Sequence, residues 1–199
     1  MLEQRIQQHF IDSADLKYQS AQTLSHPIAA AVQAVLACVT SGGKVLACGN
    51  GPSAAQAQQF AAFCVAGFER ERPELAALAL GVDGTLMAFL ATSDDAVQQI
   101  ARQVRALGQA GDVLLALSVT GNDANVLAAT EAAHERDMTV VVLTGRTGGK
   151  LAAMLRETDV LINVAHDRAA RVREVHALVL HCLSDGVDTQ LLGEQESPI

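Results

Sequence analysis

Short apolar segments recur along the chain, and each is followed by a polar or glycine-containing loop and then by a stretch with helical periodicity. The clearest are GDVLLALS (111–118) and MTVVVLTG (138–145), with KVLACG (44–49) before them and DVLINV (159–164) after them. Continuous apolar runs are typical of strands buried on both faces, and intervening helices indicate parallel pairing. The pattern predicts a doubly wound α/β fold. A further strand candidate, Leu75–Leu80, has a composition that fits a helix equally well.

The first 41 residues show a helical rhythm, with apolar residues such as Leu2, Ile6 and Phe10 at helical spacing. The segment SHPIAA (25–30) interrupts this rhythm and places a proline near a helix start. We therefore expect two N-terminal helices within 1–41, which pack on the domain and on neighbouring subunits. The doubly wound domain is predicted over 42–192, and a frayed tail over 193–199.

The chain is acidic, with 14 Lys and Arg against 22 Asp and Glu, which gives a formal net charge of −8. This balance disfavours direct contact with nucleic acid or with an anionic membrane surface. The N-terminus lacks a signal-peptide pattern, and the apolar runs of the sequence predict no membrane span. The four cysteines form no C-x-x-C pair, which favours reduced core thiols over a metal site. We expect a cytoplasmic protein.

Two loops of similar composition follow the segments 44–49 and 111–118, and each precedes an alanine-rich helix. Loops at the carboxyl ends of parallel strands line the ligand crevice of doubly wound sheets, and helix N-termini bind phosphate. One such loop alone is more simply a tight turn with a capping serine, but two matched loops favour a pocket. The candidate ligand residues are Asn50, Gly51, Ser53, Ser118, Thr120, Gly121 and Asn122.

Longer segments around these loops carry a resemblance to a known family. GGKVLACGNGPSAAQAQQFAA, QVRALGQAGDVLLALS, GNDANV, MTVVVLTGRTGGKLA and ARVREVHALVLHCLSD resemble the sugar isomerase (SIS) domain family. Within it, the chain is similar to the phosphoheptose isomerase group and to the related DnaA initiator-associating (DiaA) proteins. The resemblance covers nearly the whole chain. It implies a five-stranded parallel sheet of flavodoxin-like or Rossmann-like type, a homotetramer, and a phosphosugar ligand on Ser53, Ser118 and Thr120.

The same resemblance marks positions where this chain departs from the isomerases. Their proton-transfer and zinc positions imply a His and a Glu after the first loop, where this chain has Gln59 and Phe63. The C-terminal helix would bring a Gln and a His, and here these positions hold Arg173 and His181. Asp123 replaces a serine in the second loop and would repel phosphate unless it is protonated or turned away. It could instead cap the N-terminus of the following helix. We therefore expect no catalytic residue, no zinc cofactor and no isomerase activity.

The resulting hypothesis is a non-catalytic, DiaA-like regulator that binds the replication initiator DnaA and promotes its assembly at the chromosomal origin. A tetramer would present several weak sites at once and so raise effective concentration. The resemblance implies that the contact lies near Leu191 and Leu192, for which tetramer packing is the alternative. Two other functions stay open: a phosphoheptose isomerase acting on sedoheptulose 7-phosphate, and a phosphosugar-binding protein without turnover.

Overall fold

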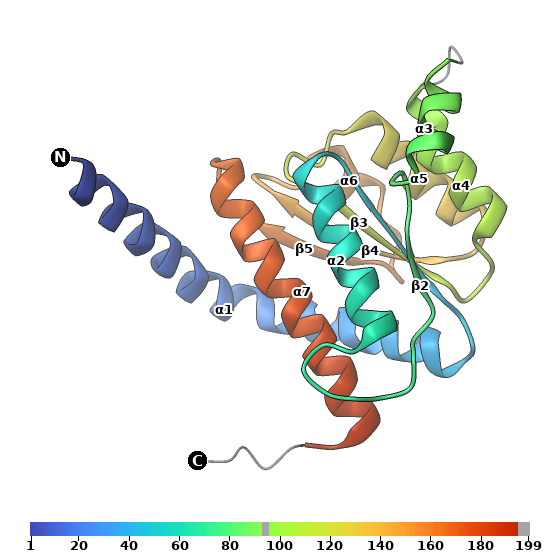
Figure 1. Cartoon of the computed structure of the whole chain (residues 1–199), viewed down its shortest axis with the longest axis horizontal. Coiled ribbons are helices and arrows are strands. Elements are labelled where there is room, and N and C mark those ends of the chain that lie inside the picture. The colour runs from blue at the N-terminus through green and yellow to red at the C-terminus, as the bar shows by residue number, and fades with distance from the viewer. Residues whose placement is uncertain (93–95, 195–199) are drawn as a thin grey trace.

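The chain folds around one parallel sheet whose strands have the order β2-β1-β3-β4-β5 (Figure 1). The structure, a computed structural model, describes residues 1–92 and 96–194. The doubly wound five-stranded parallel sheet predicted from the sequence is confirmed. Its strands are β1 (Val45–Gly49), β2 (Ala77–Ala79), β3 (Val113–Ser118), β4 (Thr139–Gly145) and β5 (Val160–Val164).

Helices cover both faces of the sheet. The helices whose buried residues pack on one face are α1 (Leu2–Thr40), α2 (Pro52–Ala66) and α7 (Ala169–Leu192). Those on the other face are α4 (Gln99–Leu107), α5 (Ala124–Glu135) and α6 (Gly149–Met154). The helix α3 (Gly84–Ala91) follows β2, and the short 3-10 turn η1 (Ala96–Gln98) leads into α4.

The apolar runs of the sequence arise because every strand residue near the centre of the sheet faces a helix layer. In β3, Leu115 and Leu117 belong to the core beneath α1, α2 and α7. Their neighbours Leu114 and Ala116 belong to the core beneath α4, α5 and α6. Both sets are fully buried, so a strand in this position has no polar face.

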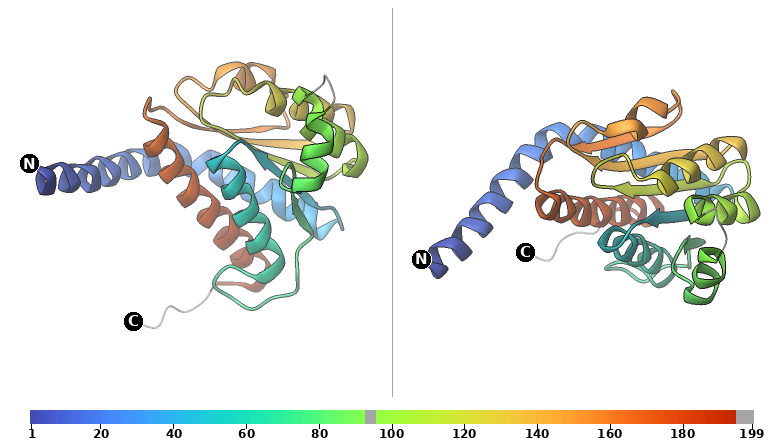
Figure 2. Two further views of the ribbon diagram at one scale, coloured as in Figure 1. Left: turned by 45° about the horizontal axis from the view of Figure 1, so that its top comes forward. Right: turned by 90° about the horizontal axis from the view of Figure 1, so that it is seen from above.

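Residues 2–40 form one continuous helix, α1, and the prediction of two N-terminal helices is wrong. Pro27 lies inside α1, where a proline removes one backbone hydrogen bond. The helix continues past it because its second half is anchored in the core, with Ala31 and Val35 fully buried. Packing of this half outweighs the local break. The helix bends along its length rather than ending (Figure 2).

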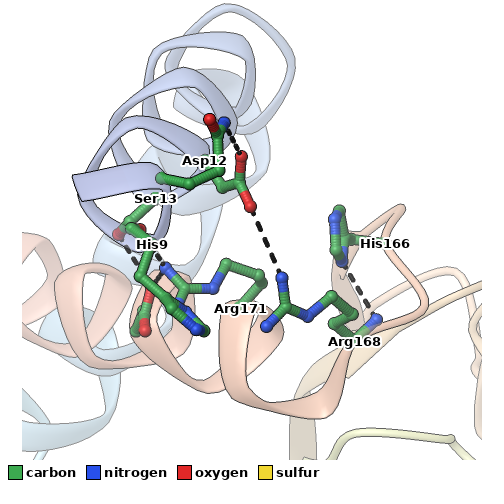
Figure 3. Close-up of polar contacts among 8 residues, drawn as sticks. His9, Asp12, Ser13, His166, Arg168 and Arg171 are labelled. Carbon is green, nitrogen blue, oxygen red and sulfur yellow. Dashed lines mark hydrogen bonds and ion pairs between the residues drawn. The ribbon is translucent and has the colours of Figure 1, made fainter. Parts of the chain in front are cut away.

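The first half of α1 projects from the rest of the molecule, and the N-terminus lies at its far end (Figures 1 and 2). Polar contacts join its base to the start of α7 (Figure 3). The Arg171 guanidinium donates to the carbonyl oxygen of His9 at 2.9 Å, and the Ser13 hydroxyl donates to the Glu174 carboxylate at 2.7 Å. On this half of α1 the apolar side chains of Leu2, Ile6 and Phe10 are exposed.

The helix α1 also bears on the expectation of no membrane-spanning segment. It contains an 18-residue window with a mean hydropathy of 1.4, so by length and composition it could cross a bilayer. The same test is passed by core helices of soluble proteins and by signal sequences, and 28% of this window is buried inside the fold. The division at residues 41 and 192 stays a prediction, and 195–199 of the predicted tail lie outside the described residues.

Candidate functional site

The strand order creates a crevice at the carboxyl ends of β1 and β3. After β1 the chain passes through α2 to β2 on one side, and β3 lies on the other side of β1. The helices that follow these two strands, α2 and α5, pack on opposite faces of the sheet. The loops after β1 and β3 therefore diverge, and ligands of doubly wound sheets bind at such a point.

The first loop, between β1 and α2, requires its glycines for different reasons. Gly51 has a φ of +52°, in the left-handed region that favours glycine. Gly49 lies so close to Ser53 that an added Cβ would come within 2.9 Å of it. This close approach brings the start of α2 against the end of β1. Ser53 is thereby held at the crevice and is 3% exposed.

The second loop, between β3 and α5, is held by its own side chains. The backbone amide of Gly121 donates to the Ser118 hydroxyl at 2.9 Å, and the amide of Asn122 donates to the Thr120 hydroxyl at 3.2 Å. Gly121 has a φ of +67°, and an added Cβ would lie 1.9 Å from the carbonyl oxygen of Gly148. Glycine is thus needed here both for its conformation and for the contact with the loop after β4.

Asp123 joins the two loops instead of capping α5. It occupies the position before α5, but its side chain makes no capping hydrogen bond. Its carboxylate accepts from the Ser118 hydroxyl, and Asn50 donates to it at 3.2 Å. Asn50 also exchanges amide hydrogen bonds with Asn125 on the first turn of α5. The Asp123 side chain therefore connects the two loops and does not cap α5, as the sequence had suggested it could.

A polar pocket of about 170 Å³ lies between these loops. It is lined by Asn50, Ser53, Leu117, Ser118, Val119, Thr120, Asp123, Arg146, Ala169 and Arg173. Four of the seven predicted ligand residues, Asn50, Ser53, Ser118 and Thr120, line it together. The other three, Gly51, Gly121 and Asn122, shape the loops, and the Asn122 side chain accepts from the amide of Lys150 at the start of α6.

Two arginines in this lining were missed as ligand residues by the sequence analysis. Arg146 follows β4 directly and has a φ of +55°, a strained conformation for a residue with a side chain. Arg146 lies at the same edge of the sheet as the two predicted loops, because it follows the strand next to β3. This position after a predicted strand could have indicated from the sequence that it lines the pocket. Arg173 comes from α7 and was interpreted only as a lost metal ligand. Together they bring two guanidinium groups to a lining that also contains the Asp123 carboxylate.

Arg173 is anchored through its backbone, while its guanidinium has no carboxylate partner among the described residues. The side-chain amide of Gln56 donates to the Arg173 carbonyl oxygen at 2.7 Å, which joins α2 to α7. The Nε of Arg173 is buried and has no hydrogen-bond partner in the described part of the chain. Burial, reinforced by the Arg173 charge, lowers the pKa of the neighbouring His176 to about 4. His176 is therefore neutral at pH 7.

The remaining positions singled out for isomerase chemistry lie outside this pocket. Phe63 packs against Phe68 and His181, with ring centroids 4.9 and 5.8 Å away, and Phe68 and His181 are 5.3 Å apart. Gln59 is exposed on α2. None of these four residues lines the polar pocket.

The donor set does not fit a zinc ion. Structural and catalytic zinc sites use three or four His, Cys, Asp or Glu ligands. Among residues 1–92 and 96–194, no group of three or more such side chains is close enough to hold a metal ion. His181 faces two phenylalanine rings, and Arg173 brings a positive charge to the pocket. No chemical step in this chain is therefore derived through zinc.

Proteins of known family are similar in sequence to this chain over most of its length. A family model described as SIS domain matches residues 9–145. The chain belongs to the SIS domain family. The phosphoheptose isomerase of Methylibium petroleiphilum is 63% identical over 196 residues, which cover 98% of both chains. That of Azoarcus sp. is 53% identical over 192 residues, covering 96% of this chain and 98% of the relative.

Solved structures give the same result. The phosphoheptose isomerase of Neisseria gonorrhoeae superimposes with a TM-score of 0.90 at 46% identity, covering 95% of this chain and all of the other. The enzyme of Francisella tularensis gives a TM-score of 0.91 at 38% identity, covering 95% of this chain and 99% of the other. The chain is thus a member of the phosphoheptose isomerase group of SIS proteins.

These relatives overturn two predictions. The hypothesis of a non-catalytic regulator that binds DnaA is wrong, since the relatives similar over nearly the full length are phosphoheptose isomerases. The prediction that the chain is not an enzyme is wrong for the same reason. Gln59, Phe63 and Arg173 are therefore no ground for placing it outside the isomerase group. Leu191 and Leu192, the proposed DnaA contact, are partly exposed at the end of α7.

Proposed function

We propose that the protein is a phosphoheptose isomerase that acts on sedoheptulose 7-phosphate and binds it in the polar pocket. The observation that carries this proposal is the 63% identity to a phosphoheptose isomerase over 98% of the chain. The pocket supports it independently, because its lining combines hydroxyls and arginines at the crevice of a doubly wound sheet.

The lining suits a phosphate group. Ser53 and Thr120 offer hydroxyl donors from two loops, while the Ser118 hydroxyl donates to Asp123. Each loop leads into a helix whose N-terminus carries partial positive charge. Arg146 adds a guanidinium at the rim, where it can pair with phosphate oxygens. We propose that these groups bind the phosphate, while the sugar extends towards Asp123 and α7.

The reaction requires a group that moves a proton between neighbouring carbons. A ketose becomes an aldose when a base removes the proton from the hydroxyl-bearing carbon beside the carbonyl and a proton returns to the former carbonyl carbon, while the proton of that hydroxyl is replaced by one on the former carbonyl oxygen. Asp123 is the carboxylate in the described lining of the pocket. Its hydrogen bonds from Ser118 and Asn50 orient it. We propose Asp123 as the proton carrier of the reaction.

The test is direct assay with sedoheptulose 7-phosphate, with the aldose product followed by NMR. We expect product from the wild-type protein, and a KM raised about tenfold or more in Ser53→Ala, because a hydrogen bond to a charged phosphate is lost. Ser41→Ala, at the exposed end of α1, is the matched control and should leave both kinetic constants unchanged. Saturable binding without product would overturn the isomerase assignment and leave only phosphosugar binding.

We also propose that the protein assembles as a homotetramer in the cytoplasm. The exposed apolar residues Leu2, Ile6 and Phe10 recur at four-residue spacing on the projecting half of α1, and such a stripe is typical of a helix that packs on another subunit. The cytoplasmic location is supported by four free cysteines, of which Cys38, Cys48 and Cys64 are buried. Both statements extend the expectations from the sequence.

A further inference from the structure

The polar pocket contains a positive charge from Arg173, at one of the four positions that the family resemblance assigns to zinc. Arg173 lines the pocket together with Ser118 and Asp123. The three other positions hold Gln59, Phe63 and His181, which lie outside the pocket. The cation at this site is therefore part of the polypeptide.

Two buried polar atoms beside Arg173 lack partners in the described part of the chain. One is the Nε of Arg173 itself, and the other is the Oε1 of Gln56. The Gln56 amide nitrogen donates to the Arg173 carbonyl oxygen at 2.7 Å, which joins α2 to α7 at this residue. A buried donor without a partner costs free energy, and at this nitrogen the Arg173 guanidinium is not tied to an acceptor in the described part of the chain.

We infer that the pocket works without a metal, and that the Arg173 guanidinium binds an oxygen of the sugar in the role that a metal ion would otherwise have. This inference rests on the proposed function, since it names how that site treats its substrate. As the base removes a proton from carbon, negative charge develops on the adjacent sugar oxygen. A guanidinium donates hydrogen bonds to such an oxygen and stabilises the charge.

The guanidinium is suited to this role by its surroundings. His176, on the same face of α7, is neutral at pH 7 and adds no competing charge. Asp123 already accepts hydrogen bonds from Ser118 and Asn50, so its carboxylate is engaged by neighbours other than Arg173. Arg173 is thus free to bind the ligand, and its charge is not cancelled by an ion pair with a described residue.

The first test is metal dependence. The protein is dialysed against EDTA, and its affinity for sedoheptulose 7-phosphate is measured by calorimetry with and without added ZnCl2. We expect the same Kd in both conditions, and equilibrium dialysis with ZnCl2 alone should give far less than one bound zinc per chain. Stoichiometric zinc binding, or ligand binding that is lost in EDTA and restored by zinc, would overturn the inference.

The second test removes the guanidinium. Arg173→Gln should weaken binding of the sugar phosphate by about 10- to 100-fold, because a charge-assisted hydrogen bond is lost, and should lower kcat as well. Arg173→Lys, which keeps the charge, should have an affinity and a kcat between those of the wild type and those of Arg173→Gln. Arg168→Gln, at the start of the same helix but outside the pocket, is the charge-matched control and should behave as wild type. Thermal unfolding of each variant verifies the fold.

The outcomes separate this inference from the proposed function. A wild-type protein that binds the sugar phosphate through Arg173 without turnover would overturn the isomerase assignment and leave Arg173 as the metal-free ligand group. Equal binding by wild type and Arg173→Gln would overturn the inference even if turnover is observed. A wild-type protein that binds neither sedoheptulose 7-phosphate nor inorganic phosphate would overturn both.

Discussion

Asn50 and Asn125 exchange two side-chain amide hydrogen bonds, of 2.9 and 2.8 Å, across the mouth of the crevice. Asn50 belongs to the loop after β1, and Asn125 lies on the first turn of α5. The pair therefore fixes the distance between the two loops that supply the pocket hydroxyls. Because it also holds Asn50 beside Asp123, it couples loop position to the orientation of the proposed proton carrier.

Replacing Asn125 with alanine should loosen this connection without unfolding the protein. The two bonds are exposed, so we expect a loss of about 1 kcal/mol or less in the free energy of unfolding. The KM for the sugar phosphate should rise severalfold, because the loops are no longer held together. Glu131→Ala, on the exposed face of the same helix, is the control. A Glu131→Ala effect as large as that of Asn125→Ala would contradict the account.

Arg72 and Asp188 form a buried ion pair that should dominate the stability of the α2–α7 contact. Their atoms approach to 2.5 Å, both side chains are 2% exposed, and Arg72 also donates to the carbonyl oxygens of Phe63 and Cys64. Arg72→Met leaves Asp188 as an unpaired buried charge and should cost about 3 kcal/mol in urea unfolding at fixed protein concentration.

Arg70→Met is the matched control for this prediction. Arg70 lies in the same loop, and within the described ranges it donates a hydrogen bond to the carbonyl oxygen of Gly193 at an exposed position, at 2.9 Å. Its replacement should cost less than about 1 kcal/mol. If the two variants lose equal stability, the buried pair is not the main tie between α2 and α7.

His176 should make the protein less stable in acid. Burial lowers its pKa from 6.5 to about 4 in the folded chain, so the unfolded chain binds the proton more readily between these values. Stability from the neutral imidazole is therefore complete above about pH 6.5 and declines as the pH falls towards 4, by up to about 3 kcal/mol. Chemical unfolding across this range measures the decline.

Two variants isolate this titration. His176→Gln keeps a donor for the Thr144 carbonyl, which His176 contacts at 2.9 Å, but it cannot be protonated in this range. We expect a flatter dependence of stability on pH in this variant. His26→Gln, which replaces an exposed histidine, should keep the wild-type dependence. An unchanged slope in His176→Gln would rule out this residue as the source.

Phe10 should hold subunits together. It is 75% exposed on the projecting half of α1, and a charge there would oppose burial against another chain. Sedimentation should show a tetramer for the wild type and smaller species for Phe10→Asp. Gln4→Asp adds the same charge on the opposite face of the helix and should leave the assembly intact. A monomeric wild type would refute the proposed assembly.

The sheet was predictable because its strands are buried on both faces. Val113 to Ser118 lie in the centre of the sheet, and such strands leave a continuous apolar run in the sequence. The short edge strand β2 was ambiguous for the opposite reason, since its burial is partial. Pro27 was read as a break, although packing of the following residues in the core carries the helix through it.

The pocket was predictable only in part. Ser53 lies shortly after a strand that the local sequence pattern reveals, and Ser118 ends another. Because the carboxyl ends of parallel strands meet at one edge of the sheet, the two serines are expected to lie together. Arg173 enters from a helix more than fifty residues after Ser118, and no local pattern shows that α7 closes the crevice. Its substitution was interpreted as a loss of metal binding, whereas in the fold it contributes a cation to the lining. Three-dimensional proximity was needed to see this.

The most direct measurement of the central claim is proton exchange at the substrate carbon. Sedoheptulose 7-phosphate is incubated with the protein in D2O, and deuterium incorporation beside the carbonyl is followed by NMR. If the pocket catalyses isomerisation through Asp123, the wild-type protein should incorporate deuterium, and Asp123→Asn should do so at least about a hundredfold more slowly. Absence of incorporation by the wild type, or an equal rate in Asp123→Asn, would contradict the account.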